Sequence, residues 1–361
     1  MHIGILSHAG NRFAGDYAAA FASRGHSVTF YSLGGQPPTI DGVAVRSFGS
    51  VEFTPSQSKS RLPYLGMILP IRWALRYDMP DVVYAIYLTS AGVLACLSGH
   101  RTIVLGAHGG DVNANIANPV WRCIFRWQAR RARLIHVVSE PLAVTLSQRA
   151  GLPQSRVILA PVGADTRLLG LIASADRPHR NHILCTRGHT PVYDQITLVR
   201  ALARLRDTGV DFHVTFGDGR QAEATRRLIT QHKLLDWTTF LGGYTLNQLP
   251  AIFAAADIYV STSISDGTSS ALLEALSTGT FPVVSDIPAN RPWVRHEQNG
   301  LLFQPGDDAM LAVCLRRAMA DSGLRASAAE SNHRLVVDNG DCNDQVDKLL
   351  ARFRDLRGIP C

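Results

Sequence analysis

The stretch 258–286 contains the residues best suited to chemistry. It alternates a buried strand, a polar turn, a short helix that starts near residues 268–270 and stops at Gly279, and another strand. A glycine in such a turn lets the backbone approach a ligand closely, and the amides at the start of a helix bind phosphate oxygens at the positive end of the helix dipole. The pattern therefore predicts a diphosphate site formed by Gly267, Thr268, Ser269 and Ser270.

Two carboxylates accompany this predicted phosphate site. Asp266 precedes the glycine, and Glu274 lies one to two turns into the helix, beside the apolar residues that supply its buried face. A carboxylate next to a phosphate loop is suited to binding the ribose diol of a nucleotide. The simpler interpretation is a helix-capping Asp and a surface Glu in an ordinary strand–helix–strand unit.

The spacing of these residues resembles a family motif. Asp266 and Glu274 are separated by seven residues and are followed by Ala275, Gly279 and Pro282, with two valines after the proline. This is similar to the E-x7-E motif of retaining GT-B glycosyltransferases, the group 1 or family 4-like enzymes, except that Asp replaces the first Glu. The resemblance implies that Asp266 contacts hydroxyls of the transferred sugar and that Glu274 contacts the nucleotide ribose.

A second part of the resemblance lies at 182–191, which is similar to the first strand and loop of the family's second domain. Arg187 matches the family's diphosphate-binding arginine, and a guanidinium can bind a diphosphate through two parallel hydrogen bonds. The lysine that the family has shortly afterwards is missing, and Tyr193 stands near its place. Tyr193 is assigned to donor binding with Arg187. The alternative for the arginine is a surface cation at a strand end.

Two loops of the first half are also similar to the family. His108 ends a strand in a loop with two glycines, and the resemblance implies that its imidazole points at the donor sugar. Asp111 is predicted to orient the imidazole or to cap the next helix, with capping as the simpler alternative. The loop after the first strand is the analogous acceptor or phosphate loop and lacks the paired glycines usual there. Its candidate residues are His8, Gly10, Asn11 and Arg12.

Glycines after two further strands complete the predicted donor site. Gly217 and Gly219 formally fit the G-x-G-x-x-A dinucleotide fingerprint, but that fingerprint belongs on the first strand of its domain and needs an acidic residue at a neighbouring strand end. The family commonly has a G-x-G near the nucleotide, which favours donor binding. Gly242 is assigned to the same site.

Metal chemistry is not predicted. The histidines and cysteine at 179–189 lack a second ligand pair, and His182 and Cys185 point to opposite faces of a strand. The other members of this group are His179 and His189. No D-x-D pair is present to hold a divalent cation at a diphosphate. We therefore expect no metal and no cofactor, with a nucleotide-diphosphate sugar as substrate.

The order of the predicted elements indicates an α/β fold. Short β-branched runs alternate with helix-length segments on both sides of a polar stretch at 174–181, which is typical of two parallel-sheet domains. The runs are 2–7, 27–32, 43–48, 81–87, 102–108, 134–139 and 156–161, then 182–187, 211–216, 237–241, 257–262 and 281–286. A length of 361 residues suits two cores.

The resemblance implies a GT-B fold, two Rossmann-like doubly wound domains that face a central cleft. We expect residues 1–165 to form the acceptor-binding domain, 166–181 the linker and 182–340 the nucleotide-sugar-binding domain. Residues 341–361 are expected to form a C-terminal helix that returns to the first domain.

Charge and composition limit the partners. The net charge is +7 and the isoelectric point is about 9.3, so the field around the chain favours anions. A helix expected at 121–133 interleaves aromatics with arginines, and it either lies on anionic lipid or packs as ordinary scaffold. Its lipid-binding candidates are Trp121, Arg126, Arg130 and Arg133. No nucleic-acid module accompanies the charge. No membrane span or secretory signal is visible, which predicts a cytoplasmic location, with peripheral contact to the inner face of the membrane.

Together these features predict a retaining glycosyltransferase. We expect it to move a sugar from a nucleotide-diphosphate sugar, with a UDP-sugar favoured over a GDP-sugar, to a saccharide or polyprenyl-linked acceptor in polysaccharide or glycan biosynthesis. Two alternatives stay open. One is a sugar-nucleotide epimerase or a phosphorylase on the same architecture, and the other is a non-catalytic subunit that binds sugar nucleotides.

Overall fold

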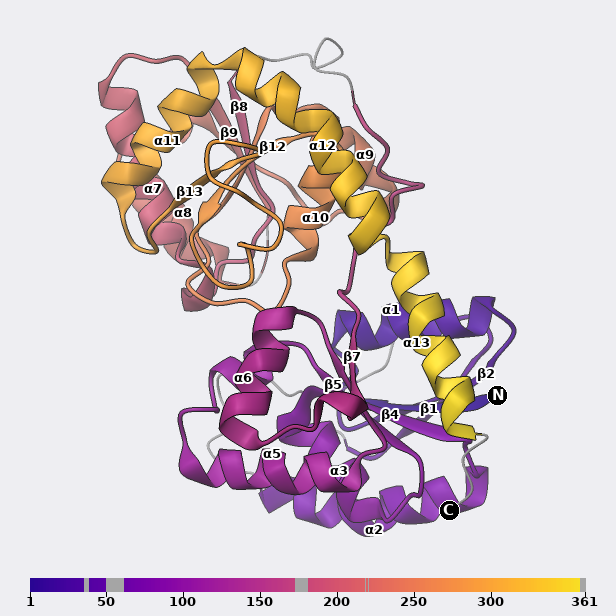
Figure 1. Ribbon diagram of the computed structural model, residues 1–361. Helices are drawn as coiled ribbons and strands as arrows, with labels where there is room; N and C mark the ends of the chain where they lie inside the picture. The colour runs from indigo at the N-terminus through magenta and orange to yellow at the C-terminus, as the bar shows by residue number, and fades with distance from the viewer. Residues whose placement is uncertain (36–38, 50–61, 173–180, 218, 220, 358–361) are drawn as a thin grey trace. The chain divides into compact units, whose positions relative to one another are not determined.

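The computed structural model describes residues 1–35, 39–49, 62–172, 181–217, 219 and 221–357 (Figure 1). The chain divides into two compact units. The first contains residues 1–162 and the C-terminal residues from 343, and the second contains residues 163–342. Of the predicted linker, residues 166–172 belong to the second unit, and residues 173–180 lie outside the described ranges.

The first unit is built on a seven-stranded parallel sheet with the order β3-β2-β1-β4-β5-β6-β7. Its strands are β1 (His2–Ser7), β2 (Ser27–Ser32), β3 (Val43–Ser47), β4 (Val82–Ile86), β5 (Ile103–Ala107), β6 (Leu134–Val137) and β7 (Val157–Leu159). Each strand lies within one of the runs predicted from the sequence. The central strands β4 and β5 are buried along their whole length, as expected when helices cover both faces of a parallel sheet.

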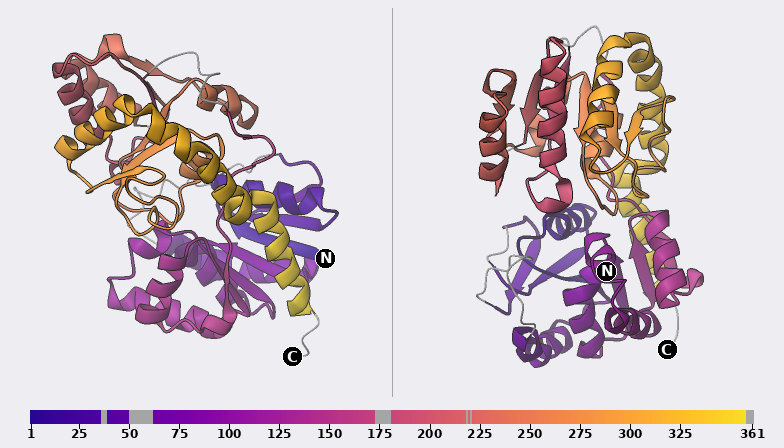
Figure 2. Two further views of the ribbon diagram at one scale, coloured as in Figure 1. Left: turned by 45° about the horizontal axis from the view of Figure 1, so that its top comes forward. Right: turned by 90° about the vertical axis from the view of Figure 1, so that its left-hand side faces the viewer.

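Helices cover both faces of this sheet (Figures 1 and 2). Successive strand residues point to opposite faces, so Val83 packs with α2, α3, α5 and α6, whereas Tyr84 packs with α1 and α13. The helices are α1 (Arg12–Ser23), α2 (Leu62–Asp78), the π-helix η1 (Tyr87–Gly92), α3 (Val93–Ser98), α4 (Gly110–Asn113), α5 (Pro119–Arg131), α6 (Glu140–Ala150), the 3₁₀ turn η2 (Gln154–Arg156) and α13 (Cys342–Arg357).

The second unit contains a six-stranded parallel sheet with the order β10-β9-β8-β11-β12-β13. Its strands are β8 (His182–Cys185), β9 (His213–Phe216), β10 (Thr238–Phe240), β11 (Ile258–Ser261), β12 (Phe281–Ser285) and β13 (Leu301–Phe303). The last of these was not predicted, because none of its three residues is β-branched, unlike the runs from which the other strands were predicted. The two parallel sheets confirm the predicted α/β fold class.

The helices of the second unit also form two layers. Residues of α7, α8 and α11 share one core with Val260, and residues of α9, α10 and α12 share the opposite core with Tyr259. The helices are η4 (Pro191–Tyr193), α7 (Gln195–Asp207), α8 (Ala222–Gln231), η5 (Leu235–Trp237), η6 (Leu246–Gln248), α9 (Leu249–Ala254), α10 (Ser270–Ser277), α11 (Asp308–Ala320) and α12 (Ser322–Gly340).

Each sheet reverses its strand order once. In the first unit the reversal lies between β1 and β4, and in the second it lies between β8 and β11. In open α/β sheets, ligands bind beyond the carboxyl ends of the strands at this point. The loops after β8 and β11 therefore form the expected ligand site of the second unit, and these loops carry Arg187 and Asp266.

The glycine that follows α10 is expected to be required for stability. Gly279 has a φ of 72°, and a Cβ there would lie 2.7 Å from Leu171 Cδ1. We expect Gly279→Ala to lower the free energy of unfolding by about 2–4 kcal/mol, through left-handed strain and crowding. The matched control is Gly209→Ala, because Gly209 has a similar φ of 74° but open space around it. Urea denaturation that gives equal losses for the two variants would show that crowding contributes nothing.

Candidate functional site

The helix α10 begins where the sequence predicted. Its N-cap residue, Ser269, has an extended backbone and accepts a hydrogen bond on its Oγ from the backbone N–H of Leu272 at 3.2 Å. Apolar residues of α10 pack against one face of the sheet and so orient the helix relative to the strands. The start of α10 is therefore held rigidly at the carboxyl end of β11.

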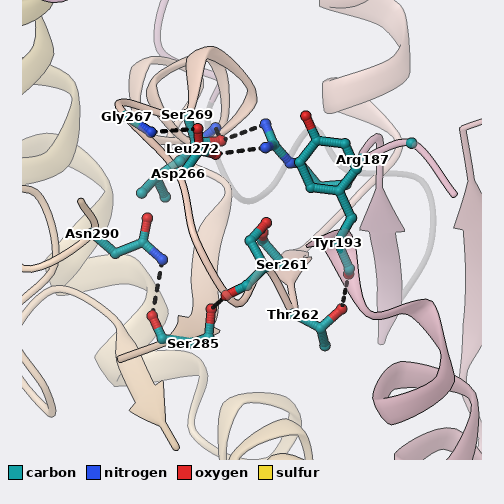
Figure 3. A network of polar contacts seen from close by, with 12 residues as sticks. Arg187, Tyr193, Ser261, Thr262, Asp266, Gly267, Ser269, Leu272, Ser285 and Asn290 are labelled. Carbon is teal, nitrogen blue, oxygen red and sulfur yellow. Dashed lines mark hydrogen bonds and ion pairs between the residues drawn. The ribbon is translucent and has the colours of Figure 1, made fainter. Parts of the chain in front are cut away.

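Arg187 joins the loop after β8 to the start of α10 (Figure 3). Its Nη2 donates to Asp266 Oδ2 at 2.5 Å, and its Nη1 donates to Ser269 Oγ at 3.0 Å. The ring of Tyr193 lies against the guanidinium, with 4.1 Å between the guanidinium carbon and the ring centroid. The structure thus brings four of the predicted donor-site residues together, and an aromatic ring packs on Arg187 near the place where the family has its lysine.

The electrostatics of this cluster keep Arg187 charged. Burial lowers the pKa of its guanidinium, but the neighbouring Asp266 carboxylate more than offsets this, and the pKa lies above its ordinary value. The two side chains are only 11% and 16% exposed. A buried cation of this kind can bind a phosphate strongly, provided that the phosphate takes over the role of the carboxylate.

Some polar atoms of the site have no protein partner. Arg187 Nε and Ser270 Oγ are buried and make no hydrogen bond to any of the described residues. Leaving such atoms unsatisfied costs about 1–3 kcal/mol each, which indicates where polar atoms of a ligand would be accommodated. The backbone N–H of Gly267 differs from the prediction in that it donates to Asp266 Oδ1 at 2.8 Å.

Glu274 is buried in α10, with 8% of the residue exposed. This contradicts the simpler interpretation of Glu274 as a surface glutamate. Carboxylates are seldom buried unless they are paired or serve a ligand. Its predicted contact with a ribose stays a prediction.

The loop after β9 is held by a buried histidine that sequence reasoning had considered only as a metal ligand. His189 Nε2 bonds to the carbonyl of Gly217 at 2.8 Å, and its Nδ1 bonds to Thr225 Oγ1 at 2.9 Å. A Cβ at Gly217 would lie 3.2 Å from the backbone of Thr186. A Cβ at Gly219 or Gly242 would meet no atom within 4 Å. Packing against Thr186 therefore accounts for a glycine at position 217, whereas Gly219 and Gly242 border open space.

Gln195 is a positioning residue that sequence reasoning missed. It is buried in the first turn of α7, and its Nε2 donates to the carbonyls of Arg187 at 3.2 Å and of Gly188 at 3.0 Å. The available signal was a glutamine on the mainly apolar buried face of the helix, directly after the arginine loop. Gln195 fixes the backbone that carries the guanidinium.

The histidines considered for zinc serve separate purposes. His182 Nε2 bonds to Thr215 Oγ1 at 2.8 Å, and Cys185 lies against Gln195. His179 lies outside the described residues. Over the ranges that the structure describes, no group of three or more His, Cys, Asp or Glu side chains is placed to hold a metal ion.

His108 lies in an aromatic cluster at the carboxyl end of β5. Its ring stacks on Phe13 at 5.5 Å and meets Tyr87 and His136 edge-on at 5.7 and 5.6 Å between ring centroids. Neither ring nitrogen bonds to a described residue. Burial holds the pKa of His108 well below its ordinary value, with a smaller contribution from His136. The imidazole is therefore neutral at pH 7 and has both nitrogens unpaired within the described chain.

Asp111 holds the backbone of the histidine loop and not the imidazole. Its Oδ1 accepts from the backbone N–H of His108 at 3.2 Å, and its Oδ2 accepts from that of Leu88 at 2.7 Å. The predicted orientation of the imidazole by Asp111 is therefore wrong, because both oxygens bind backbone amides. Burial raises the pKa of Asp111 to about 6.

Tyr87, which faces His108, was not predicted as a site residue. It has a φ of 77°, a strained conformation for an aromatic residue, and it starts the π-helix η1. Such strain and π-helices occur frequently at functional sites. No sequence signal marks either feature.

The loop after β1 contains both buried and exposed candidate residues. Burial lowers the pKa of His8 to about 4, and its Nε2 lies 3.2 Å from the hydroxyl of Tyr64. Asn11 donates to Ser7 Oγ at 3.0 Å. Arg12 pairs with Asp16 at 3.5 Å on the surface, and Gly10 is exposed. An acceptor role for these residues stays a prediction.

The buried His136 is expected to make the stability pH-dependent. It bonds to Tyr84 Oη at 2.7 Å and to the carbonyl of Ala160 at 2.6 Å, and burial lowers its pKa to about 4. As the pH falls from 6.5 to 4, the unfolded chain binds a proton that the folded chain resists, so about 3 kcal/mol of stability is lost. We expect the ring signals of His136 in NMR spectra not to titrate above pH 5.

Replacement of this histidine provides the control. Glutamine can make the same two hydrogen bonds without titrating, so His136→Gln should reduce the fall of the unfolding free energy between pH 6.5 and 4 by about 3 kcal/mol, while the buried His8 and His108 still contribute to it. An unchanged slope, or a midpoint near 6.5 for the wild-type signals, would contradict the assignment.

The aromatic residues of α5 face the protein. Trp121 packs on Phe125, with 5.6 Å between ring centroids, and Phe125 and Ala129 are buried in the core. Arg126, Arg130 and Arg133 are exposed. Trp121 is partly buried, the arginines are the exposed candidates, and lipid contact by all four residues stays a prediction. Within the described residues, no helix is long and apolar enough to cross a membrane.

Each of the two units matches a known protein family. Residues 175–335 match the family described as glycosyl transferases group 1, and residues 10–168 match glycosyltransferase family 4. The first match falls within the second unit, and the other covers most of the first unit. The chain thus contains a glycosyltransferase group 1 domain and a glycosyltransferase family 4 domain.

Curated proteins are similar to this chain at low identity. It is 24% identical to a 2-deoxystreptamine glucosyltransferase of Streptomyces kanamyceticus over 67% of this chain and 66% of that protein. It is 25% identical to a GDP-mannose-dependent phosphatidylinositol monomannoside mannosyltransferase of Mycolicibacterium smegmatis over 75% of both chains. Two other relatives are matched over only 40% and 42% of their lengths. The chain thus spans less than two thirds of several of these relatives.

Solved structures share the fold of this chain. A sucrose-phosphate synthase of Thermosynechococcus elongatus matches with a TM-score of 0.83 and 18% identity, over 99% of both chains. Anabaena HepE in complex with UDP-glucose matches with a TM-score of 0.75 and 19% identity, over 98% of this chain and 100% of that one. These likenesses confirm the GT-B fold.

Proposed function

We propose that this protein is a glycosyltransferase that transfers a sugar from a nucleotide-diphosphate sugar to a saccharide acceptor, with retention of the anomeric configuration. The observation that carries the proposal is the cluster of Arg187, Asp266 and Ser269 at the strand-order reversal of the second unit. A buried cation, a helix start and unpaired polar atoms at one place suit a diphosphate better than any other common ligand.

The leaving diphosphate would be stabilised by the guanidinium of Arg187 and by the start of α10. The bond between the anomeric carbon and the phosphate oxygen breaks, the acceptor oxygen bonds to the same carbon, and the acceptor proton passes to the leaving phosphate. The negative charge that develops on the phosphate lies where Arg187 now binds the Asp266 carboxylate. This account needs no metal and no nucleophile from the protein.

Each carboxylate has a separate role in this proposal. Glu274 binds the ribose, and Asp266 turns from Arg187 to the sugar hydroxyls once the diphosphate has taken its place. The neutral imidazole of His108, with both nitrogens unpaired within the described chain, suits hydrogen bonding to the donor sugar. Roles for Asp111 and the loop after β1 at the acceptor follow from the family resemblance alone.

The donor class and the acceptor are proposed from the relatives. A UDP-sugar is favoured, as in the HepE complex, with a GDP-sugar as the second option, as named for the mycobacterial mannosyltransferase. The acceptor is a saccharide, polyprenyl-linked or otherwise lipid-linked, as the phosphatidylinositol mannoside of that relative suggests. We propose polysaccharide or glycan biosynthesis at the cytoplasmic face of a membrane.

Transfer is favoured over the alternatives. The names of these relatives describe transfer of glucose or mannose and not epimerisation or phosphorolysis. A purely binding subunit would not need a neutral, unpaired histidine in addition to the diphosphate site.

A donor panel followed by product analysis tests the proposal. UDP-, GDP- and ADP-sugars are added in turn, and a ligand that binds only the folded state raises the melting temperature. The donor that binds is then incubated with lipid-linked and free saccharides, and the anomeric configuration of the product is read by NMR. We expect one nucleotide class to stabilise the protein and the product to keep the donor's configuration. Inversion, phosphate dependence or turnover without an acceptor would contradict retaining transfer.

A further inference from the structure

The helix α2 exposes a row of large apolar side chains. Leu65, Leu69, Trp73 and Tyr77 are 60%, 65%, 73% and 80% exposed. They stand four residues apart, so they form a single stripe along one face of the helix. An isolated exposed apolar residue is ordinary, but a contiguous stripe of this kind marks an interaction surface.

The opposite face of α2 already supplies the packing that the fold requires. Ile71 and Leu75 are fully buried in the first unit's core, and Met67 and Ile68 pack against it. The helix is therefore apolar on both faces, although the described residues cover only one of them. Tyr77 lies against Arg46, with 5.4 Å between the guanidinium carbon and the ring centroid, and most of the surface of the four side chains remains exposed.

The layer that contains α2 is strongly basic. α2 packs on α3, and α3 packs on α5, so the three helices form one layer on the sheet (Figure 1). The three helices contain six arginines and one acidic residue, Asp78, which is paired with Arg46, and α6 on the same face of the sheet adds Arg149 and Glu140. The six arginines of the three helices are Arg72, Arg76, Arg122, Arg126, Arg130 and Arg131.

We propose that the α2 stripe inserts into the interface of an anionic lipid bilayer while the arginines of α2 and α5 bind the lipid headgroups. An apolar stripe with an aromatic residue, flanked by arginines, is the composition of helices that lie in the plane of a membrane. With 17 residues and two arginines, α2 is suited to lying on a bilayer and not to crossing it. This extends the proposed peripheral membrane contact, since the insertion comes from α2 and α5 contributes only charge.

A bilayer fits this surface better than a soluble partner does. The apolar side chains and the excess positive charge together match both components of a bilayer surface, its hydrocarbon and its anionic headgroups. A second copy of this chain would bring six further arginines against the same layer, which like charges disfavour.

Flotation with vesicles tests this inference. Purified protein is mixed with vesicles of phosphatidylethanolamine and phosphatidylglycerol, or of phosphatidylcholine alone, and the bound fraction is measured. We expect Leu65→Ser/Leu69→Ser/Trp73→Ser to lower partitioning to the anionic vesicles by at least about tenfold, because each buried side chain contributes to binding. Arg126→Glu/Arg130→Glu should weaken it mainly at low salt.

The control replaces equally exposed residues of the second unit. Leu235→Ser/Leu246→Ser removes side chains that are 61% and 49% exposed and should leave vesicle binding unchanged. The stripe variant should keep the wild-type thermal shift with nucleotides, because the diphosphate site lies in the other unit. Equal partitioning of wild type and stripe variant overturns the inference, and so does a wild-type dimer that only the stripe variant dissociates. Vesicle binding without any nucleotide binding would contradict the proposed function and leave the inference standing.

Discussion

Replacing Arg187 by alanine is expected to lower kcat/KM for sugar transfer by roughly 10²- to 10³-fold, because the charge that faces the leaving diphosphate is lost. The same change leaves the Asp266 carboxylate without the cation that it binds at 2.5 Å. The measurement is initial-rate kinetics with the donor that stabilises the folded protein, together with the nucleoside diphosphate as a competitive inhibitor.

Two further variants separate the role of the charge from that of the fold. Arg187→Lys keeps one positive charge but not the two parallel donors, so its kcat/KM should lie between those of wild type and alanine variant. Asp266→Asn removes the carboxylate that competes for the guanidinium, and it should tighten binding of the nucleoside diphosphate while transfer falls. Wild-type kinetics in Arg187→Ala would contradict the assignment of Arg187 to the diphosphate site.

The second large effect concerns the buried carboxylate of α10. We expect Glu274→Ala to weaken nucleotide binding by about 10- to 100-fold, the loss that follows removal of a charged hydrogen-bond acceptor. If Glu274 binds the ribose, the loss should disappear for a donor analogue whose ribose lacks the contacted hydroxyl. Titration calorimetry with the ribonucleotide and its 2′- and 3′-deoxy analogues measures this coupling.

A surface glutamate provides the comparison for this variant. Glu223 pairs with Arg227 on the exposed face of α8 at 3.1 Å, and Glu223→Ala should leave all of these affinities unchanged. Continued discrimination between the ribose and deoxyribose analogues by Glu274→Ala would assign the ribose contact to another residue.

Much of the fold was predictable because its strands are buried. A parallel strand covered on both faces must be apolar throughout, so β4 and β11 stand out between polar turns. The helix α10 was predictable for a similar reason, since a capping serine precedes its apolar residues and Gly279 follows its last turn. β13 was missed because none of its three residues is β-branched.

The site was only partly predictable, because its contacts join distant segments. Arg187 and Asp266 were each found from local spacing, but their ion pair joins the ends of β8 and β11 and depends on the strand order. Gln195 and Tyr87 were missed because a backbone contact and a strained φ leave no signature in the sequence. The exposure of the α2 stripe was also hidden, since an apolar row of this spacing is usual for a buried helix.

The most direct measurement is a crystal structure of the protein with the nucleoside diphosphate that its donor releases. The account predicts that phosphate oxygens lie within hydrogen-bond distance of the Arg187 guanidinium and the start of α10, that Asp266 no longer binds Arg187, and that the ribose contacts Glu274. A nucleotide bound elsewhere, with the ion pair between Arg187 and Asp266 intact, would contradict it.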